Sequence, residues 1–151
     1  MSPTSTFLNP PSASEATPSW QSSSYAHRSV PDVAFNADWN NTPIIVYFTA
    51  SSTSGISQSG YYLNGGTSLA SPLFVGVWAR LESANNNGLG FAAPALYAYS
   101  GSFPFHDVST GSNGYYSATT GRDNATGWGS IDIQAASSFI TATPGFNTAT
   151  H

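Results

Sequence analysis

The sequence predicts an α/β fold in which two short strands precede three helices. A compact run of β-branched and aromatic residues, 44–49, has the composition of a strand. A long stretch after Ser68 repeats its apolar residues with the spacing of a helix, and the stretch 132–142 has a capping residue before it and Pro-Gly after it. Strands followed by helices in this order fit the edge of an α/β sandwich, and 151 residues are the length of one domain.

The first half of the chain leads into the long helix. Residues 1–24 are rich in Ser, Thr and Pro, and we expect a loop or a poorly ordered segment there. The strand at 44–49 is followed by a Ser/Gly-rich turn at 51–59. A second short strand, 61–64, then brings the chain to Ser68.

Three helices are expected after this point. The first, over about 68–83, presents a wide apolar stripe for burial and is ended by the Asn-rich residues 85–88. A shorter helix begins near Pro94, because proline suits a first helical turn. The last helix covers 132–142, with Ser130 or Asp132 as its N-cap.

Composition excludes several classes of function. The chain has three arginines, no lysine, five aspartates and two glutamates, so it offers no basic face for nucleic acid. Few ionisable groups also mean little charge build-up in acid, which suits an acid-tolerant protein. Cysteine is absent, so disulfides and thiol chemistry are excluded. No apolar run approaches the length of a membrane span, and the first residues do not resemble a signal peptide, so we expect no membrane partner.

The segment before the long helix carries the clearest chemical signal, Gly65-Gly66-Thr67-Ser68-Leu69-Ala70-Ser71-Pro72. It places a hydroxyl at a helix N-terminus, where unpaired N–H groups and the helix dipole favour negative charge. Acyl transfer needs such a place, since the attacked carbonyl becomes an oxyanion. Pro72 is expected in about the first turn, where its missing N–H matters little. A simpler interpretation is that Thr67 or Ser68 is only an N-cap.

This segment resembles the nucleophile motif of the subtilisin-like superfamily. The doubled glycine and the continuation Pro72-Leu73-Phe74 are similar to the sedolisins, the serine-carboxyl peptidases, rather than to subtilisins proper. Further stretches resemble that family in the right order, and the match runs from about residue 18 to about residue 140. These stretches are 30–38, 105–108 and 125–130. The resemblance implies the C-terminal portion of a subtilisin-like parallel-sheet sandwich, with a long calcium-binding loop.

The resemblance implies acid-active serine endopeptidase chemistry, with Ser68 as the nucleophile that forms an acyl-enzyme with a peptide or protein substrate. Sedolisins use a glutamate as base, an aspartate that orients it, and a second aspartate at the oxyanion. Glu82 lies fourteen residues beyond Ser68 on the same helix, roughly 20 Å away, and is too far to act as the base. Glu15 has no aspartate four residues later. Asp32 and Asp38 are expected to be turn or cap partners.

A histidine base is the alternative. The chain has His27, His106 and His151, and His106 stands beside Asp107. Adjacent residues rarely point together, so the spacing gives a Ser-His-Asp triad little support.

We therefore expect a fragment that lacks the Glu/Asp base pair and the oxyanion aspartate, and that is inactive alone without the N-terminal part of its catalytic domain. Its parts would be an approach loop, 1–24, the C-terminal part of the peptidase domain, 25–143, and a tail, 144–151. The parent protein is expected to be secreted.

The long loop 101–130 is expected to hold one Ca²⁺ ion. Calcium takes several oxygen ligands, often two carboxylates plus carbonyls of glycine-bent loops. The resemblance implies five ligands: the side chains of Asp107 and Asp123 and the carbonyls of Val108, Thr119 and Gly121. Arg122 stands where sedolisins often have an aromatic residue, and a cation there is unfavourable unless it points away. Spacing alone favours both aspartates as turn residues of a Gly/Ser-rich loop, and only the flanking motifs that resemble the family favour the calcium site.

Two other classes of function stay open. One is a non-catalytic calcium-binding or interaction module derived from a peptidase. The other is a β-rich adhesive or carbohydrate-binding domain, which the Ser, Thr, Asn and aromatic content would suit.

Overall fold

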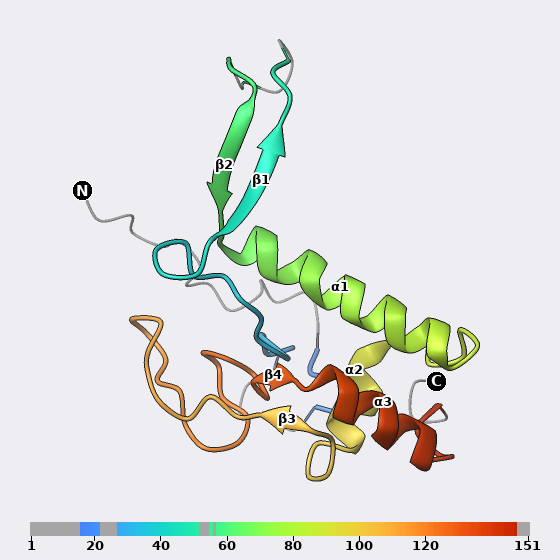
Figure 1. Ribbon diagram of the computed structural model, residues 1–151. Coiled ribbons are helices and arrows are strands. Elements are labelled where there is room, and N and C mark those ends of the chain that lie inside the picture. Colours follow the sequence, from blue (N-terminus) through green and yellow to red (C-terminus); the bar gives the residue numbers. More distant parts are fainter. Residues whose placement is uncertain (1–15, 22–26, 52–54, 56, 148–151) are drawn as a thin grey trace. The chain divides into compact units, whose positions relative to one another are not determined.

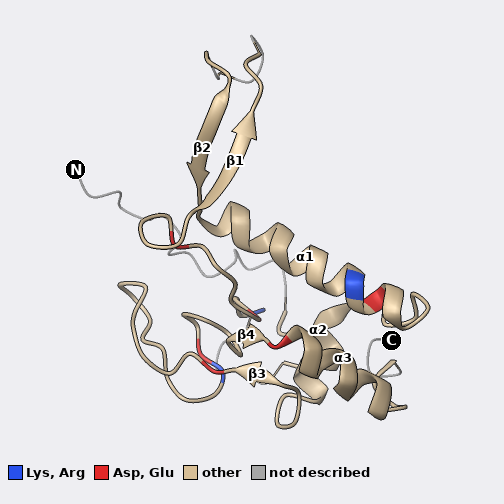
Figure 2. Cartoon of the chain, viewed as in Figure 1, with Lys and Arg blue, Asp and Glu red and all other residues tan. Residues whose placement is uncertain are grey.

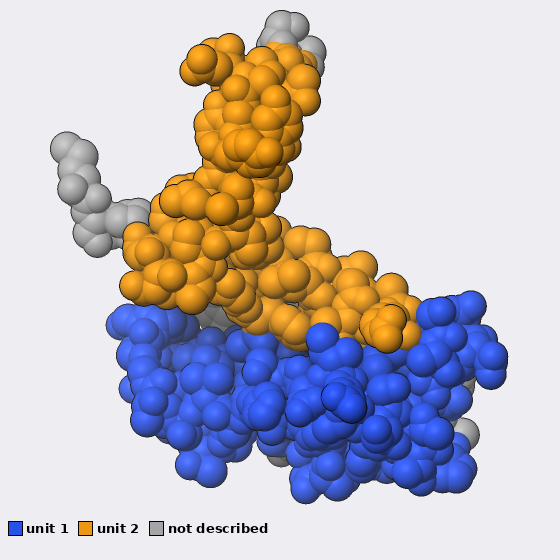
Figure 3. Space-filling model, in the orientation of Figure 1, with its two compact units in different colours: residues 1–34, 81–151 blue, residues 35–80 orange. Residues whose placement is uncertain are grey.

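The computed structural model describes residues 16–21, 27–51, 55 and 57–147 (Figure 1). The chain divides into two compact units (Figure 3). Unit 1 comprises residues 1–34 and 81–151, and unit 2 comprises residues 35–80. None of the described helices is long and apolar enough to cross a membrane.

Unit 2 contains a β-hairpin followed by most of a long helix. Strands β1 (Ile44–Phe48) and β2 (Gly60–Asn64) pair antiparallel, and α1 (Thr67–Ala84) begins directly after them. The sequence predicted each of these elements to within one residue at either end. Figure 2 shows how little charge this unit carries, since no residue between Asp38 and Arg80 is charged.

The parallel strand pairing expected from the resemblance is not found in the described part of the chain. Both strand pairs, β1 with β2 and β3 (Phe105–His106) with β4 (Ser130–Ile131), are antiparallel. The connection between β1 and β2, residues 49–59, is too short for the crossover of a dozen or more residues that parallel strands require. The residues between β3 and β4 contain no helix to form such a crossover. The observed sheets are therefore two separate ribbons.

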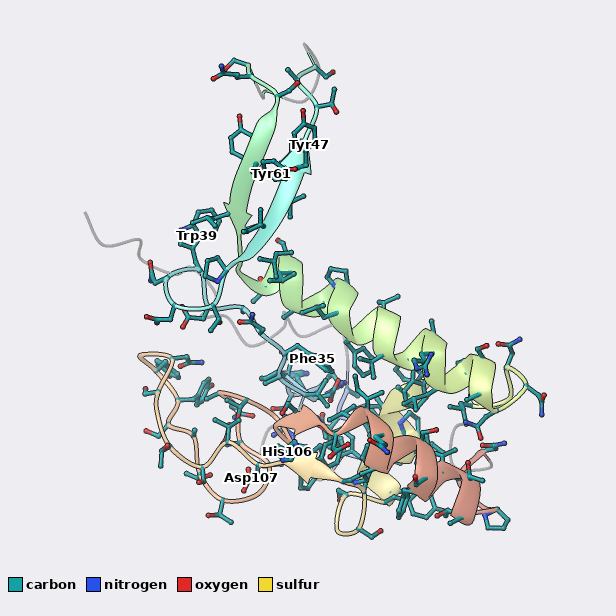
Figure 4. All side chains as sticks on the ribbon, in the orientation of Figure 1. Phe35, Trp39, Tyr47, Tyr61, His106 and Asp107 are labelled. Carbon is teal, nitrogen blue, oxygen red and sulfur yellow. The ribbon has the colours of Figure 1, made fainter. Side chains whose placement is uncertain are left out.

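One face of the hairpin is apolar and exposed. Ile45 pairs with Leu63 and Tyr47 pairs with Tyr61, so these four side chains share a face. They are between 56% and 78% exposed. The rings of Tyr47 and Tyr61 lie 5.0 Å apart, side by side on the hairpin (Figure 4). The hairpin therefore presents a continuous surface that a protein normally covers.

The core of unit 1 is built by two helices and a cluster of aromatic rings. Helices α2 (Ala92–Ala98) and α3 (Ile133–Ala142) contribute the buried Leu96 and Ile140. Phe146, which follows α3, is completely buried and stacks on Tyr99 at 5.3 Å. The other rings of the cluster are Phe103 and Phe139.

The helix ends follow the predicted signals. The Asp132 carboxylate accepts a hydrogen bond from Ala135 N at 2.9 Å, so Asp132 is the N-cap of α3. Helix α1 ends before Asn86 and Asn87, which both have φ of 57°. The Glu82 carboxylate accepts hydrogen bonds from Leu89 N and Gly90 N and closes this turn.

Candidate functional site

Ser68 is the second residue of α1 and is exposed. The carbonyl of Gly66 accepts hydrogen bonds from Leu69 N at 2.9 Å and Ala70 N at 3.2 Å, which gives Gly66 the N-cap position. The simpler interpretation of Thr67 or Ser68 as the N-cap is therefore wrong, because both residues lie inside the helix. The Ser68 hydroxyl stands in the first turn, among N–H groups that have no partner within the helix.

The glycine turn before Ser68 is fixed against the segment that precedes β1. Gly66 N donates a hydrogen bond to Ala37 O at 2.8 Å, and Gly66 has a φ of 87°, which favours glycine. A Cβ on Gly65 would lie 2.8 Å from Trp39 Cα, so only glycine fits at this close approach. The position of Ser68 therefore depends on backbone contacts that the two glycines permit.

Pro72 is the sixth residue of α1, further into the helix than the first turn that the sequence predicted. In an α-helix the N–H of residue 72 would donate to the carbonyl of residue 68. Proline has no N–H, so the Ser68 carbonyl has no helical donor. Pro72 thus removes one hydrogen bond of the helix at the residue that carries the candidate nucleophile.

Unit 2 contains one carboxylate, and it is engaged elsewhere. Asp38 accepts hydrogen bonds from the backbone N–H groups of Asn40 and Asn41 and from the Asn41 side chain at 2.7 Å. These bonds, the Asn41 side chain first, hold the pKa of Asp38 below its ordinary value. Asp38 is the turn residue that the sequence predicted, and unit 2 supplies Ser68 with no carboxylate base.

The other candidate bases have structural partners. The Asp32 carboxylate accepts a hydrogen bond from Tyr97 Oη and forms an ion pair with Arg28. His106, labelled with Asp107 in Figure 4, is exposed, and its Nε2 lies 3.8 Å from Asp132 Oδ2. Glu15 and His151 lie outside the described residues.

Loop 107–127 brings the two expected calcium carboxylates to the same short segment. Asp107 Oδ2 accepts a hydrogen bond from Gly121 N at 2.8 Å, and Asp123 Oδ2 accepts one from Thr119 N at 2.7 Å. Thr126 Oγ1 lies 3.5 Å from the Val108 carbonyl oxygen. The five residues named as ligands therefore belong to one loop cluster.

Asp123 is the most constrained of these residues and is 8% exposed. Burial raises the pKa of its carboxyl, but hydrogen bonds from the backbone N–H groups of Thr119, Thr126 and Ala125 outweigh burial and lower it. The net pKa lies below its ordinary value. Asp123 therefore stays charged in mildly acidic solution.

The donor set suits a hard cation. Carboxylates and carbonyl oxygens are the ligands that calcium prefers. Within the described residues Asp123 Oδ2 accepts one hydrogen bond, which leaves it a lone pair. Among the residues described, no three His, Cys, Asp or Glu side chains are grouped for a metal. A cation here would therefore depend on backbone carbonyls as much as on Asp107 and Asp123.

A polar cluster that the sequence did not reveal lies beside this loop. Its centre is Tyr97 Oη, which accepts hydrogen bonds from Gln21 Nε2 at 2.7 Å and Arg122 Nε at 2.8 Å and donates one to Asp32 Oδ1 at 2.9 Å. The remaining members are Ser29 and Asn124. Contacting members of the cluster are up to 95 positions apart in the chain, so no local pattern could have indicated their contact.

Comparison with known proteins gives the family. The chain is 45% identical over 135 residues to sedolisin from Pseudomonas sp. (strain 101), which covers 83% of this chain and 21% of that protein. It is 46% identical over 139 residues to xanthomonalisin from Xanthomonas sp. (strain T-22), a match that covers 85% of this chain and 15% of that protein. The chain belongs to the sedolisin family. No family model matches it.

The fold agrees with this family. The solved structure of Pseudomonas sedolisin, described as a serine-carboxyl proteinase in complex with two molecules of pseudo-iodotyrostatin, matches with a TM-score of 0.75 at 42% identity. The match covers 87% of this chain and 35% of that one. This sedolisin-family chain thus spans about a fifth or less of the two curated relatives above, and about a third of the solved structure.

Proposed function

We propose that this chain is the nucleophile-bearing, calcium-binding part of an acid-active, secreted serine endopeptidase, with peptides or proteins as substrates. The observation that carries the proposal is the position of Ser68, exposed in the first turn of α1 directly after the Gly65-Gly66 turn. The names of the relatives, which are peptidases of the serine-carboxyl type, support the same chemistry.

In the proposed reaction Ser68 Oγ attacks a peptide carbonyl while a base accepts its proton, and water later hydrolyses the acyl-enzyme. The positive end of the helix dipole at the start of α1 favours the negative charge that develops on the carbonyl oxygen. The base is proposed to lie outside these 151 residues, because the chain contains no glutamate followed four residues later by an aspartate. The chain alone is therefore proposed to be inactive.

Calcium is proposed to bind the loop cluster through Asp107, Val108, Thr119, Gly121 and Asp123. The convergence of both carboxylates on residues 119–121 supports this ligand set. The ion would stabilise the folded loop by binding only to the native state. It would take no part in the reaction at Ser68.

A chimera tests the catalytic proposal. This chain would replace the corresponding C-terminal part of Pseudomonas sedolisin, and peptide hydrolysis would be measured at acidic pH. We expect an active chimera, no activity from the chain alone, and complete loss with Ser68→Ala. Ser71→Ala, an exposed hydroxyl one turn further along α1, is the matched control and should keep activity.

The same experiment examines the alternative, a non-catalytic calcium-binding module. An inactive but folded chimera, together with a melting temperature of the chain that calcium raises, would favour the module. Hydrolysis by the chain alone that needs Ser68 would contradict the proposed absence of a base.

A further inference from the structure

We infer that Arg122 is a positioning residue for the calcium loop: the polar cluster holds its guanidinium away from the loop's carboxylates and fixes the loop that carries them. The inference rests on the calcium site of the proposed function. It answers a conflict in the sequence, since Arg122 stands between Gly121 and Asp123, two of the proposed ligands. A guanidinium turned toward them would repel a divalent cation.

Each nitrogen of the guanidinium donates to an acceptor that is not one of the proposed ligands. Nε donates to Tyr97 Oη at 2.8 Å, and Nη1 donates to Asn124 Oδ1 at 3.0 Å. Nη2 donates to Ser29 Oγ at 3.0 Å and to Pro31 O at 3.3 Å. All three nitrogens therefore have partners, as the forked geometry of arginine allows and that of lysine does not.

The acceptor at the centre of this arrangement cannot easily turn away. A hydroxyl has one hydrogen to donate and two lone pairs, and Tyr97 Oη uses all of them on Gln21, Arg122 and Asp32. Gln21 is itself held by Ser29, through hydrogen bonds at 2.7 and 2.8 Å. The cluster thus offers Arg122 one defined position.

The far end of the loop is tied to the same segment. Trp128 N donates to Asp32 O at 2.8 Å, and a Cβ on Gly127 would lie 2.2 Å from that oxygen. Residues 29–32 therefore hold the loop at Arg122 and again at 127–128. Asp123 lies between these two points, so the cluster restricts the loop before any ion binds.

Two substitutions separate positioning from charge. Arg122→Met removes both the hydrogen bonds and the charge. Arg122→Lys keeps the charge and loses the fork, which frees an ammonium beside the ligands. We expect both variants to bind Ca²⁺ more weakly than the unsubstituted chain, and Arg122→Lys more weakly than Arg122→Met. The calcium affinity of Arg122→Lys should be about tenfold lower than that of the unsubstituted chain, as is common when a residue that supports metal ligands is changed.

The experiment is calorimetric titration of the full chain with Ca²⁺, with amide hydrogen exchange of Thr119, Ala125 and Thr126 in calcium-free buffer as a second readout. Arg80→Met, an exposed arginine on α1, is the control and should change neither. Equal calcium affinity in all four proteins, or tighter binding by Arg122→Met, would overturn the inference.

A chain that binds no Ca²⁺ would overturn the proposed calcium site. In that case the amides of Thr119, Ala125 and Thr126 could still exchange faster in Arg122→Lys than in the unsubstituted chain. Arg122 would then be a structural residue of the loop and not a positioning residue for an ion. That pattern distinguishes failure of the site from failure of the inference.

Discussion

Replacing Tyr97 with phenylalanine removes one oxygen atom and three hydrogen bonds from the polar cluster. Two of these bonds join the hydroxyl to charged groups, the Arg122 guanidinium and the Asp32 carboxylate. A net contribution is about 1 kcal/mol for a neutral hydrogen bond and about 1.5–3 kcal/mol for one to a charged group. The sum is an upper limit, since each former partner keeps other contacts.

Those remaining contacts limit how far Tyr97→Phe lowers the free energy of unfolding. Gln21 Nε2 still donates to Ser29 O, and the Asp32 side chain is 26% exposed and keeps its ion pair with Arg28. We therefore expect Tyr97→Phe to lower the free energy of unfolding by about 2–3 kcal/mol. For a chain of this length the melting temperature would fall by about 5–10 °C.

Thermal unfolding followed by circular dichroism at neutral pH measures this change. Tyr99→Phe is the matched control, because Tyr99 packs its ring on Phe146 and its hydroxyl has no hydrogen bond in the described part of the chain. If Tyr97→Phe lowered the melting temperature no more than Tyr99→Phe does, the cluster would not be a source of stability. The reasoning about its saturated hydroxyl would then be refuted.

Four further predictions concern single positions. Burial, and then the charge of Asp32, raises the pKa of Tyr97. The stability that the neutral Tyr97 hydroxyl contributes is therefore present below pH 10 and is lost as the pH rises through the folded-state pKa. Tyr97→Phe should remove this alkaline loss from a plot of unfolding free energy against pH. Asp132→Ala should lower the free energy of unfolding by about 1 kcal/mol in denaturant titration, and Asp132→Asn should restore most of it. Gly129→Ala should prevent folding, because the new Cβ would lie 2.1 Å from His106 O, and the soluble yield should be lost. Gly114 also has a positive φ but open space around it, so Gly114→Ala should stay soluble. Ser68→Ala should change the free energy of unfolding by less than about 0.5 kcal/mol in the same titration, since the residue is exposed; a larger change would assign Ser68 a structural role.

The sequence predicted those features that depend on neighbouring residues. β-branched and aromatic composition located β1, apolar spacing located α1, and the cap and stop signals around 132–142 located α3, with Ser130 or Asp132 as its cap. The N-terminus of α1 was placed one residue too late, because Thr and Ser compete with glycine for the N-cap and the sequence does not show which one closes the first turn.

Features that depend on distant residues could not be predicted. The resemblance implied a parallel-sheet sandwich, whereas the described strands pair antiparallel, β1 with β2 and β3 with β4. The direction of the Arg122 side chain was left open, since it depends on Tyr97 and Ser29, which come from other parts of unit 1. Of the candidate site, the positions of Ser68 and of the two loop aspartates were predictable, and their supporting contacts were not.

The absence of charge between Asp38 and Arg80 has a consequence for handling the protein in solution. Lysine and other charges on strand edges normally keep hairpins from pairing with one another, and β1 and β2 have none. The polar groups that these strands expose to water are neutral, such as the hydroxyls of the exposed Tyr47 and Tyr61. Salt screens repulsion between charges, and these strands carry none, so lowering the salt concentration would do little to keep this hairpin from associating.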